Sequence, residues 1–190
     1  MKFSRGFRLC AGVVIVFGFG QAAFAQGSPT RHVNVAIIPA NPEDVGTIDA
    51  IIRVSYEAIS GGVGVPRQWA RERTLNDPHS IFVSAELDPK TGKTVIERTT
   101  DQEFADQSDA GMVREGFTER ELGHVVHRFG NVATVVSSYE GKSALRGKVV
   151  DRGVNIFNLY FDGKRWWILS IVWDSERADN PIPAELLPKS

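Results

Sequence analysis

Two apolar segments joined by a short polar turn dominate the pattern of hydrophobic and polar positions along the chain. They fill residues 153–176, are rich in β-branched and aromatic side chains, and are separated by the polar residues 162–164. This pattern predicts a β-hairpin. Strict alternation along its second strand would place Trp167 and Trp173 on one face and Trp166 on the other. Both faces are largely apolar, which predicts that each is covered, one of them by helices and a pocket.

The first half of the chain has the spacing of helices. Apolar residues recur at helical intervals over residues 42–60, after Asn41, which can cap a helix. The pattern predicts a single helix there, ended by the glycine pair 61–62. A second, shorter helix is predicted from Pro66 to about Leu75.

A third helix is predicted from Thr100 to about Gln107. Thr100 and Glu103 have the spacing of a capping box, in which each side chain bonds to the other residue's backbone. The polar, glycine-flanked residues 109–116 are predicted to form a loop.

Residues 117–129 fit two different structures. Leu122, Val125 and Val126 have the spacing of a helix face. Gly123 and the adjacent valines, in contrast, disfavour a helix interior. On spacing alone the helix is favoured.

The remaining segments have the pattern of strands and turns. Strands are predicted at residues 81–87, 94–98 and 132–139, turns at 76–78 and 88–93, and a polar connection at 140–148. Helices that precede a run of strands predict an α+β domain, with the helices packed on one face of a mostly antiparallel sheet.

The N-terminal residues 1–25 have the pattern of a secretory signal peptide. Basic residues precede an apolar stretch, and small residues at positions 23 and 25 allow cleavage after Ala25. We therefore expect a periplasmic or secreted protein that is not held in a membrane after cleavage. Residues 26–40 are expected to form an N-terminal arm, either as an added edge strand or as an ordered irregular segment.

Charge and cysteine content exclude several kinds of partner. The chain has 22 basic and 23 acidic residues, and residues 1–25 contain three of the basic ones, which leaves 19 basic against 23 acidic residues. This balance argues against nucleic acid or an anionic membrane surface as a partner. Cys10 is the only cysteine and lies within the predicted signal peptide. Thiolate chemistry and cysteine-ligated metals are therefore excluded after cleavage.

Two stretches of the C-terminal half carry a resemblance to a known family. HRFGNVATVVSSYEGK, residues 127–142, and RGVNIFNLYFDGKRWWILSIVWDSERADNPIP, residues 152–183, resemble the nuclear-transport-factor-2-like (NTF2-like) superfamily. Within it, they are similar to the bacterial SnoaL-like and DUF4440-like branch. The helices predicted upstream agree with this resemblance in their order.

The resemblance implies a cone-shaped domain over residues 41–183, followed by a loose tail at 184–190. In such a domain a strongly curved, mostly antiparallel sheet wraps against three helices, with an apolar cavity at the open end. Residues 119–129 would then be a strand, against their helical spacing. The resemblance also implies a homodimer formed through the outer face of the sheet. Members include isomerase-like, dehydratase-like and cyclase-like enzymes and proteins without chemistry, so the fold does not fix the function.

Several polar side chains are candidates for chemistry in such a cavity. Glu119 and Glu121 would share one strand face, and a carboxylate entering an apolar cavity can act as a general acid or base. Glu121 is preferred because it lies deeper in the predicted strand, although pairing with a nearby arginine is the commoner fate of such a residue. His124 and His127 are alternative bases. A strand would point them in opposite directions, which disfavours a metal site, and we expect none.

Ligand contacts are predicted from aromatic and amide side chains. Trp69, Trp167 and Trp173 could wall a cavity for a flat molecule, or serve only as packing. Asn155 is a polar residue within an apolar run and could meet either a ligand or a neighbouring strand. The ligand-binding candidates are therefore Trp69, Glu121, Asn155, Trp167 and Trp173.

Three functions remain open on this evidence, the third of which is a module that serves only for dimerisation. The chain has no nucleophile elbow, phosphate-binding glycine loop or dinucleotide fingerprint, and we expect no cofactor. The first hypothesis is an exported protein that holds a small apolar or aromatic molecule in its cavity. The alternative is a cofactor-independent lyase or isomerase that uses a pocket carboxylate or histidine as its general base.

Overall fold

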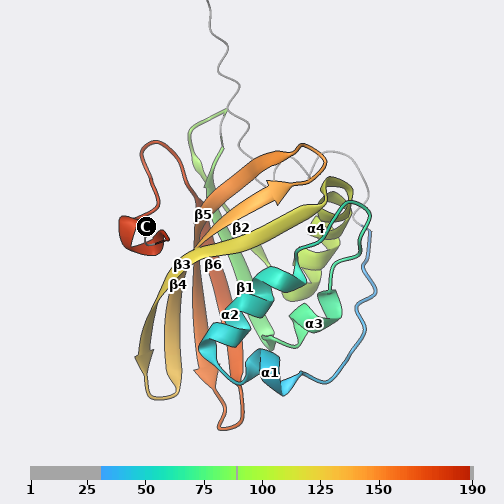
Figure 1. The fold of residues 1–190 in the computed structure, drawn as a ribbon, viewed down its shortest axis with the longest axis vertical. Coiled ribbons are helices and arrows are strands. Elements are labelled where there is room, and N and C mark those ends of the chain that lie inside the picture. The colour runs from blue at the N-terminus through green and yellow to red at the C-terminus, as the bar shows by residue number, and fades with distance from the viewer. Residues whose placement is uncertain (1–30, 89, 189–190) are drawn as a thin grey trace, which may run out of the picture.

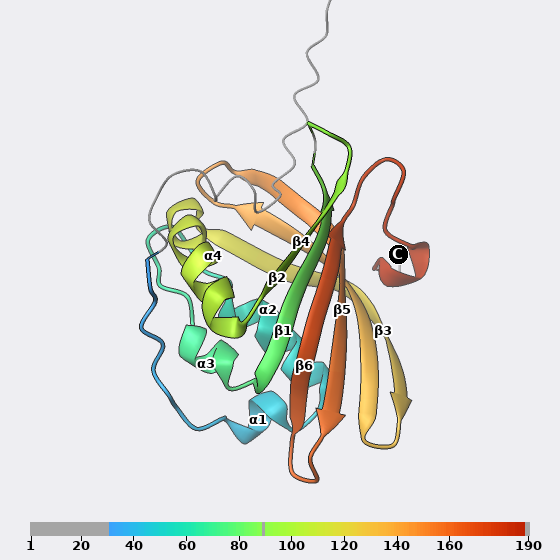
Figure 2. The ribbon, with the colours of Figure 1, turned by 180° about the vertical axis from the view of Figure 1, so that it is seen from behind.

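The computed structural model describes residues 31–88 and 90–188. A six-stranded sheet curves around a group of helices that cover one of its faces (Figures 1 and 2). The α+β class and the cone-shaped, mostly antiparallel architecture expected from the sequence are confirmed. The predicted signal peptide and the first residues of the arm lie outside the described residues. None of the helices described is both long and apolar enough to cross a membrane.

The single helix expected over residues 42–60 is divided into two. Helix α1 covers Pro42–Val45 and α2 covers Ile48–Ala58. Thr47 separates them, because its backbone is extended and its side chain accepts a hydrogen bond from the Ala50 amide at 3.1 Å. Thr47 therefore caps a new helix, a local signal that the continuous apolar stripe concealed. This division gives four α-helices where three were expected.

The third predicted helix begins where expected and is much longer. Helix α4 covers Asp101–Glu115 and has the capping box of Thr100 and Glu103. It ends at Gly116, whose φ of 61° is left-handed. The prediction of a loop at 109–116 was wrong because α4 buries small and polar residues such as Ser108 and Gly111, so its inner face lacks an apolar stripe. The second predicted helix is shorter than expected, with α3 at Trp69–Arg73.

The strands follow one another in a mostly antiparallel sheet. They are β1 (Asn76–Leu87), β2 (Thr94–Thr99), β3 (Phe117–Phe129), β4 (Val132–Ser143), β5 (Lys148–Phe161) and β6 (Trp166–Ser175). The order across the sheet is β2-β1-β6-β5-β4-β3, and only β1 and β6 run parallel. Residues 117–129 form a strand, as the resemblance implied and their spacing did not. The turn expected at 76–78 is instead the irregular start of β1, with a register shift before Ile81.

A bulge in β6 changes which tryptophans face the helices. Leu159 pairs with Ile168 and Asn158 with Ser170, so Leu169 is an extra residue without a partner. An extra residue reverses the alternation beyond it. Trp166 and Trp173 consequently lie on the helix side of the sheet, and the predicted grouping of Trp167 with Trp173 was wrong.

A second bulge lies in β3. Glu121 pairs with Tyr139 and Gly123 with Ser138, which leaves Leu122 unpaired. The bulge brings Glu121 and His124 to the same face, where plain alternation would separate them.

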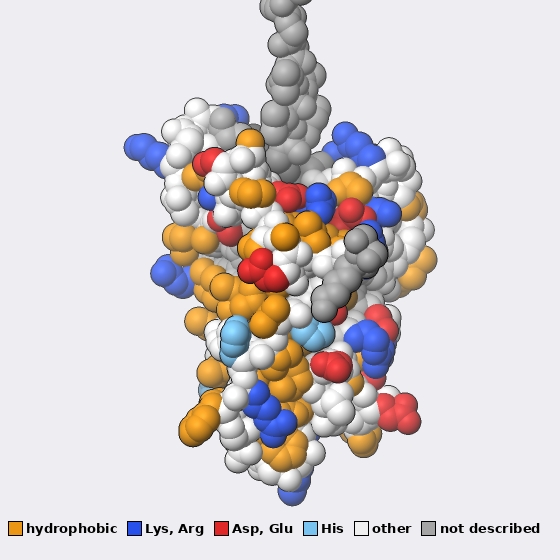
Figure 3. Space-filling model, turned by 60° about the vertical axis from the view of Figure 1, so that its left-hand side comes forward, with side chains coloured by type: hydrophobic (Ala, Val, Ile, Leu, Met, Phe, Trp, Pro, Cys, Tyr) orange, Lys and Arg blue, Asp and Glu red, His pale blue; other side chains and the backbone are white. Residues whose placement is uncertain are grey.

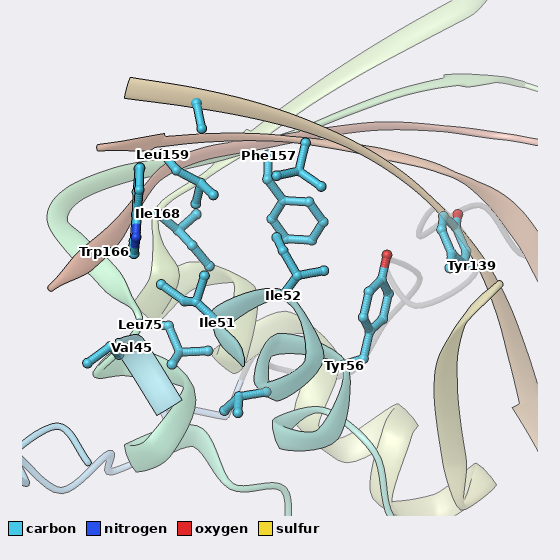
Figure 4. Packing of buried hydrophobic residues seen from close by; sticks show 13 residues of the cluster. Val45, Ile51, Ile52, Tyr56, Leu75, Tyr139, Phe157, Leu159, Trp166 and Ile168 are labelled. Atoms are coloured by element: carbon cyan, nitrogen blue, oxygen red, sulfur yellow. The ribbon is translucent and has the colours of Figure 1, made fainter. Parts of the chain in front are cut away.

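The core lies between the concave face of the sheet and α2. Ile51 and Ile52 of α2 are fully buried against Phe157 and Ile168 of the hairpin (Figure 4). The rings of Tyr56 and Phe157 meet edge to face, with centroids 6.2 Å apart. This packing fixes α2 over the sheet, and Figure 4 shows the Tyr56 hydroxyl pointing toward the strands.

Both terminal segments pack onto the domain. Residues 31–40 form no strand and are held as an irregular arm, since the Val33 amide donates to Asp106 at 2.7 Å and Gln102 donates to the Val33 carbonyl at 2.9 Å. At the other end, Ala184–Leu186 form the short 3-10 helix η2. Leu186 is buried and its carbonyl accepts a hydrogen bond from Ser138 of β4. Residues 184–186 therefore belong to the folded domain and are not part of a loose tail.

Candidate functional site

A cavity of about 150 Å³ lies between the sheet and the helices. Aromatic side chains form part of its wall, with Phe82 from β1, Phe104 from α4, Phe157 from β5 and Trp173 from β6. Phe104 meets Phe82 and Trp173 edge to face, with ring centroids 5.3 and 6.2 Å apart. A cavity of this volume is large enough for a molecule with one aromatic ring.

Two carboxyl groups reach the cavity from β3 and β5, the strands on either side of β4. Burial, together with the negative charge of Asp151, raises the pKa of Glu119 on β3 to about 8, and a hydrogen bond from Asn155 opposes this rise. Burial also raises the pKa of Asp151 on β5 to about 6, while the Tyr139 and Ser175 hydroxyls limit the change. The Tyr139 hydroxyl lies 3.1 Å from Asp151 Oδ2. At neutral pH Glu119 is thus largely protonated and Asp151 largely ionised.

Three further glutamates line the cavity, Glu72 from α3, Glu86 from β1 and Glu115 from α4. Burial and the charge of Asp151 raise the pKa of Glu86 to about 7, against the effect of a hydrogen bond from the Trp173 indole at 3.2 Å. Burial, with the charge of Asp101, raises the pKa of Glu72 well above its ordinary value. Glu115 differs, because Arg146 and Ser143 outweigh the effect of burial and lower its pKa.

A chain of hydrogen bonds runs from the cavity toward the surface. Asn155 Nδ2 donates to the Tyr56 hydroxyl at 3.2 Å, and this hydroxyl lies 2.7 Å from Ser137 Oγ. Ser137 donates its own proton to Glu121 at 2.6 Å, so the Tyr56 hydroxyl must donate to Ser137. Glu121 also lies 2.9 Å from His124 Nδ1. The chain holds Asn155 and Tyr56 in position at the cavity wall.

The predicted site residues are divided between the cavity and other places. Asn155 and Trp173 line the cavity, and their contact with a ligand stays a prediction. Trp69 is buried behind Phe104, with its ring 6.0 Å away, and donates to Asp109 at 2.7 Å. It supports the wall without forming it.

The other candidates lie farther from the cavity. Glu121 and His124 contact each other at the solvent end of the hydrogen-bond chain, beyond the lining residues. His127 is exposed. Trp167 lies on the outer face of the hairpin, stacked on Tyr160 at 6.4 Å and covered by the Arg165 guanidinium.

The cavity carboxyls were mostly not identified from the sequence. Glu119 was weighed and placed second to Glu121, whereas Asp151 and Glu86 were not considered. Both lie in strands next to apolar residues, at Val150 and Leu87. An acidic residue within an apolar strand segment was the signal that could have identified them. Within the described part of the chain, no group of three or more acidic, histidine or cysteine side chains is arranged to hold a metal ion.

Comparison with known proteins supports the fold. No family model and no curated protein matches the sequence. The chain is similar to a Xanthomonas campestris structure described as a putative calcium/calmodulin-dependent protein kinase II association domain. The TM-score is 0.50 and the sequence identity 13%, and the similarity covers 78% of this chain and 98% of that one. A Bdellovibrio bacteriovorus structure also has a TM-score of 0.50, with 11% identity over 69% of this chain and 40% of that one.

A Shewanella baltica structure carries the description of an NTF2-like protein of unknown function. It has a TM-score of 0.44 and 12% identity, over 67% of this chain and 91% of that one. At such identities a likeness concerns the fold and not the activity. The two comparisons at a TM-score of 0.50 show that the chain shares its overall fold, a curved six-stranded sheet wrapped around helices, with known structures.

Proposed function

We propose that the protein binds a small, mostly apolar molecule in the cavity between the sheet and the helices. The observation that carries this proposal is the cavity itself, whose wall combines aromatic side chains with polar groups at fixed positions. Ligand sites in proteins commonly combine an apolar lining with a small number of positioned polar groups. Here Asn155, Tyr56 and Glu119 supply those groups.

Native mass spectrometry of the protein purified from its host tests this proposal. A retained small molecule is expected, and Ser108→Leu should prevent its retention because Ser108 is buried and its enlarged side chain would fill the cavity. Gln107→Leu is the matched control, since Gln107 is exposed on the same helix. A Ser108→Leu variant that stays folded and retains as much ligand as the control would contradict the proposal.

A second candidate function is proton-transfer chemistry on the bound molecule without a cofactor. It is favoured by the two cavity carboxyls whose pKa values are about 8 at Glu119 and about 6 at Asp151. In an isomerase or lyase of this kind, ionised Asp151 would remove a proton and protonated Glu119 would donate one. Catalysis would then have a bell-shaped pH profile bounded by these two values.

Substitution separates binding from catalysis. If the retained molecule is converted by the protein, Asp151→Asn and Glu119→Gln should each abolish turnover while the molecule still binds. Full turnover in both variants would eliminate this second function.

We further propose that the protein is exported and forms a homodimer through the outer face of its sheet. The signal-peptide pattern of residues 1–25 supports export. The dimer is supported by exposed apolar side chains on the outer face, including Ile81, Ile156 and Leu169. Figure 3 shows hydrophobic side chains gathered across one side of the molecule. Clustered exposed apolar groups are typical of interaction surfaces.

Both proposals are tested on protein recovered from the cell envelope. The expected mass is that of a dimer of chains cleaved after Ala25, and Ile156→Glu should yield a folded monomer. An uncleaved chain in the cytoplasm would contradict export, and a strict monomer would contradict the dimer.

A further inference from the structure

The cavity wall carries acidic side chains and no basic ones. Within the described residues, five carboxyl groups reach it: Glu72, Glu86, Glu115, Glu119 and Asp151. Arg146 and Arg114 neutralise Glu115 from outside the cavity, at 2.8 and 3.5 Å. The other four carboxyls form no ion pair with any residue that the structure describes.

Carboxyl groups buried without a cation are costly when ionised. The protein avoids this cost by keeping protons on some of them, since burial raises the pKa of Glu119 to about 8 and that of Glu86 to about 7. The titratable groups that face Glu119 are Asp151 from β5, Tyr139 from β4 and Tyr56 from α2. None of them supplies a positive charge. A cation inside the cavity would therefore meet carboxyls that lack a counterion.

Glu72 adds a buried carboxyl to the same wall. Its side chain is only 3% exposed and lines the cavity. Oε1 accepts a hydrogen bond from Asn76 at 2.7 Å, whereas Oε2 is buried and accepts no hydrogen bond from a described donor. The Asp101 carboxyl bonds to that of Glu72 and raises its pKa, so the two groups share a proton. Glu72 therefore adds to the acidic character of this wall.

The aromatic wall fits the same kind of molecule. Phe104 lies between Phe82 and Trp173, so ring faces and edges are both presented around the cavity. Aromatic faces attract ammonium groups, and aromatic rings also pack well against one another. The volume of about 150 Å³ has room for one ring and a short substituent.

We propose that the ligand is a small primary amine with a single aromatic ring, bound as its ammonium ion with the nitrogen toward the cavity carboxyls and the ring against Phe104 and Trp173. This inference rests on the proposed binding function and names the chemical class of its ligand. The cation replaces protons that the carboxyl groups otherwise hold, and its N–H groups donate to carboxylate oxygens.

The proposed chemical class of the ligand is tested by isothermal titration calorimetry on the mature chain. Three probes of similar size and different charge are compared. The probes are benzylammonium, benzyl alcohol and benzoate. Benzylammonium should bind at least about tenfold more tightly than benzyl alcohol, and benzoate more weakly than either. Binding of the cation near neutral pH should also release protons, because it lowers the pKa of Glu119. The measured heat should therefore change with the ionisation enthalpy of the buffer.

Two variants test whether the preference for benzylammonium over benzyl alcohol arises in the cavity. Glu119→Gln should reduce the advantage of benzylammonium over benzyl alcohol and reduce proton release, while benzyl alcohol still binds. Glu185→Gln removes an exposed carboxyl outside the cavity and should leave the preference unchanged. Retention of benzyl alcohol binding shows that the Glu119→Gln cavity is intact.

The outcomes separate this inference from the binding proposal. Equal binding of benzylammonium and benzyl alcohol, or tighter binding of benzoate, would overturn the amine inference and leave the binding function standing. Failure of all three probes to bind would overturn both.

Discussion

The raised pKa of Glu119 predicts that replacing this residue changes how stability depends on pH. The native state holds the Glu119 proton up to a pH of about 8, whereas the unfolded chain releases it near the ordinary value of 4.5. Above the lower value the unfolded state gains free energy by ionising and the native state does not. The contribution of Glu119 therefore turns against folding as pH rises from about 4.5 to about 8, and is constant outside this window. Glu119→Gln removes this contribution.

The size of the effect follows from the two pKa values. Each pKa unit corresponds to about 1.4 kcal/mol, so the values of 4.5 and about 8 give an upper limit of about 5 kcal/mol. Because the side chain is only half-buried by its exposed area, solvent screening lowers the expected effect to about 2–3 kcal/mol. Relative to the parent protein, Glu119→Gln should gain this much free energy of unfolding between about pH 5 and about pH 8.

Urea denaturation followed by tryptophan fluorescence measures this difference. Free energies of unfolding are compared for the parent, Glu119→Gln and Glu185→Gln at several pH values across the window. Glu185 is exposed in the folded protein, so its variant should follow the parent curve. A constant difference between Glu119→Gln and the parent at every pH would refute the reasoning, because it would mean that Glu119 ionises equally in both states.

Three further predictions follow from other contacts. Tyr56→Phe removes the hydroxyl that joins Asn155 to Ser137 and should lower the free energy of unfolding by about 1–3 kcal/mol in urea denaturation; an unchanged value would mean that the chain of hydrogen bonds is not formed. Trp173→Phe should weaken binding of the retained ligand measured by calorimetry, whereas Trp167→Phe should not, because only Trp173 lines the cavity. Truncation after residue 183 removes buried Leu186 and should destabilise the domain by about 2 kcal/mol, seen as a lower thermal midpoint; an unchanged midpoint would show that η2 does not contribute.

The sequence predicted the elements better than their details. Capping of α4 was identified from Thr100 and Glu103 because both partners lie within one turn. The break between α1 and α2 was missed although its signals, Gly46 and the Thr47 cap, are local, because the apolar stripe continues across it. The bulge at Leu169 was missed because it depends on how β5 and β6 pair and not on the bulged residue.

The sequence predicted the position of a cavity residue only where the pattern of its own strand determines that position. Asn155 and Trp173 were identified from their positions in the hairpin, and both line the cavity. The choice between Glu119 and Glu121 depended on contacts from other strands. Glu121 is bound by Ser137 of β4, while Glu119 faces Asp151 of β5. Such neighbours are set by sheet register, which a single sequence does not specify.

The parallel pairing of β1 with β6 has a consequence for how the chain folds. Phe82 of the first strand lies beside Ile171 of the last one, so the sheet is completed only when almost the whole domain is present. Until then the β1–β2 hairpin has an open edge, and open edges invite pairing with other chains. Contacts this distant in sequence also slow folding, because a long loop must close first. A chain with this topology stays incomplete during synthesis until β6 has emerged, and the open edge of its hairpin is exposed to aggregation for that interval.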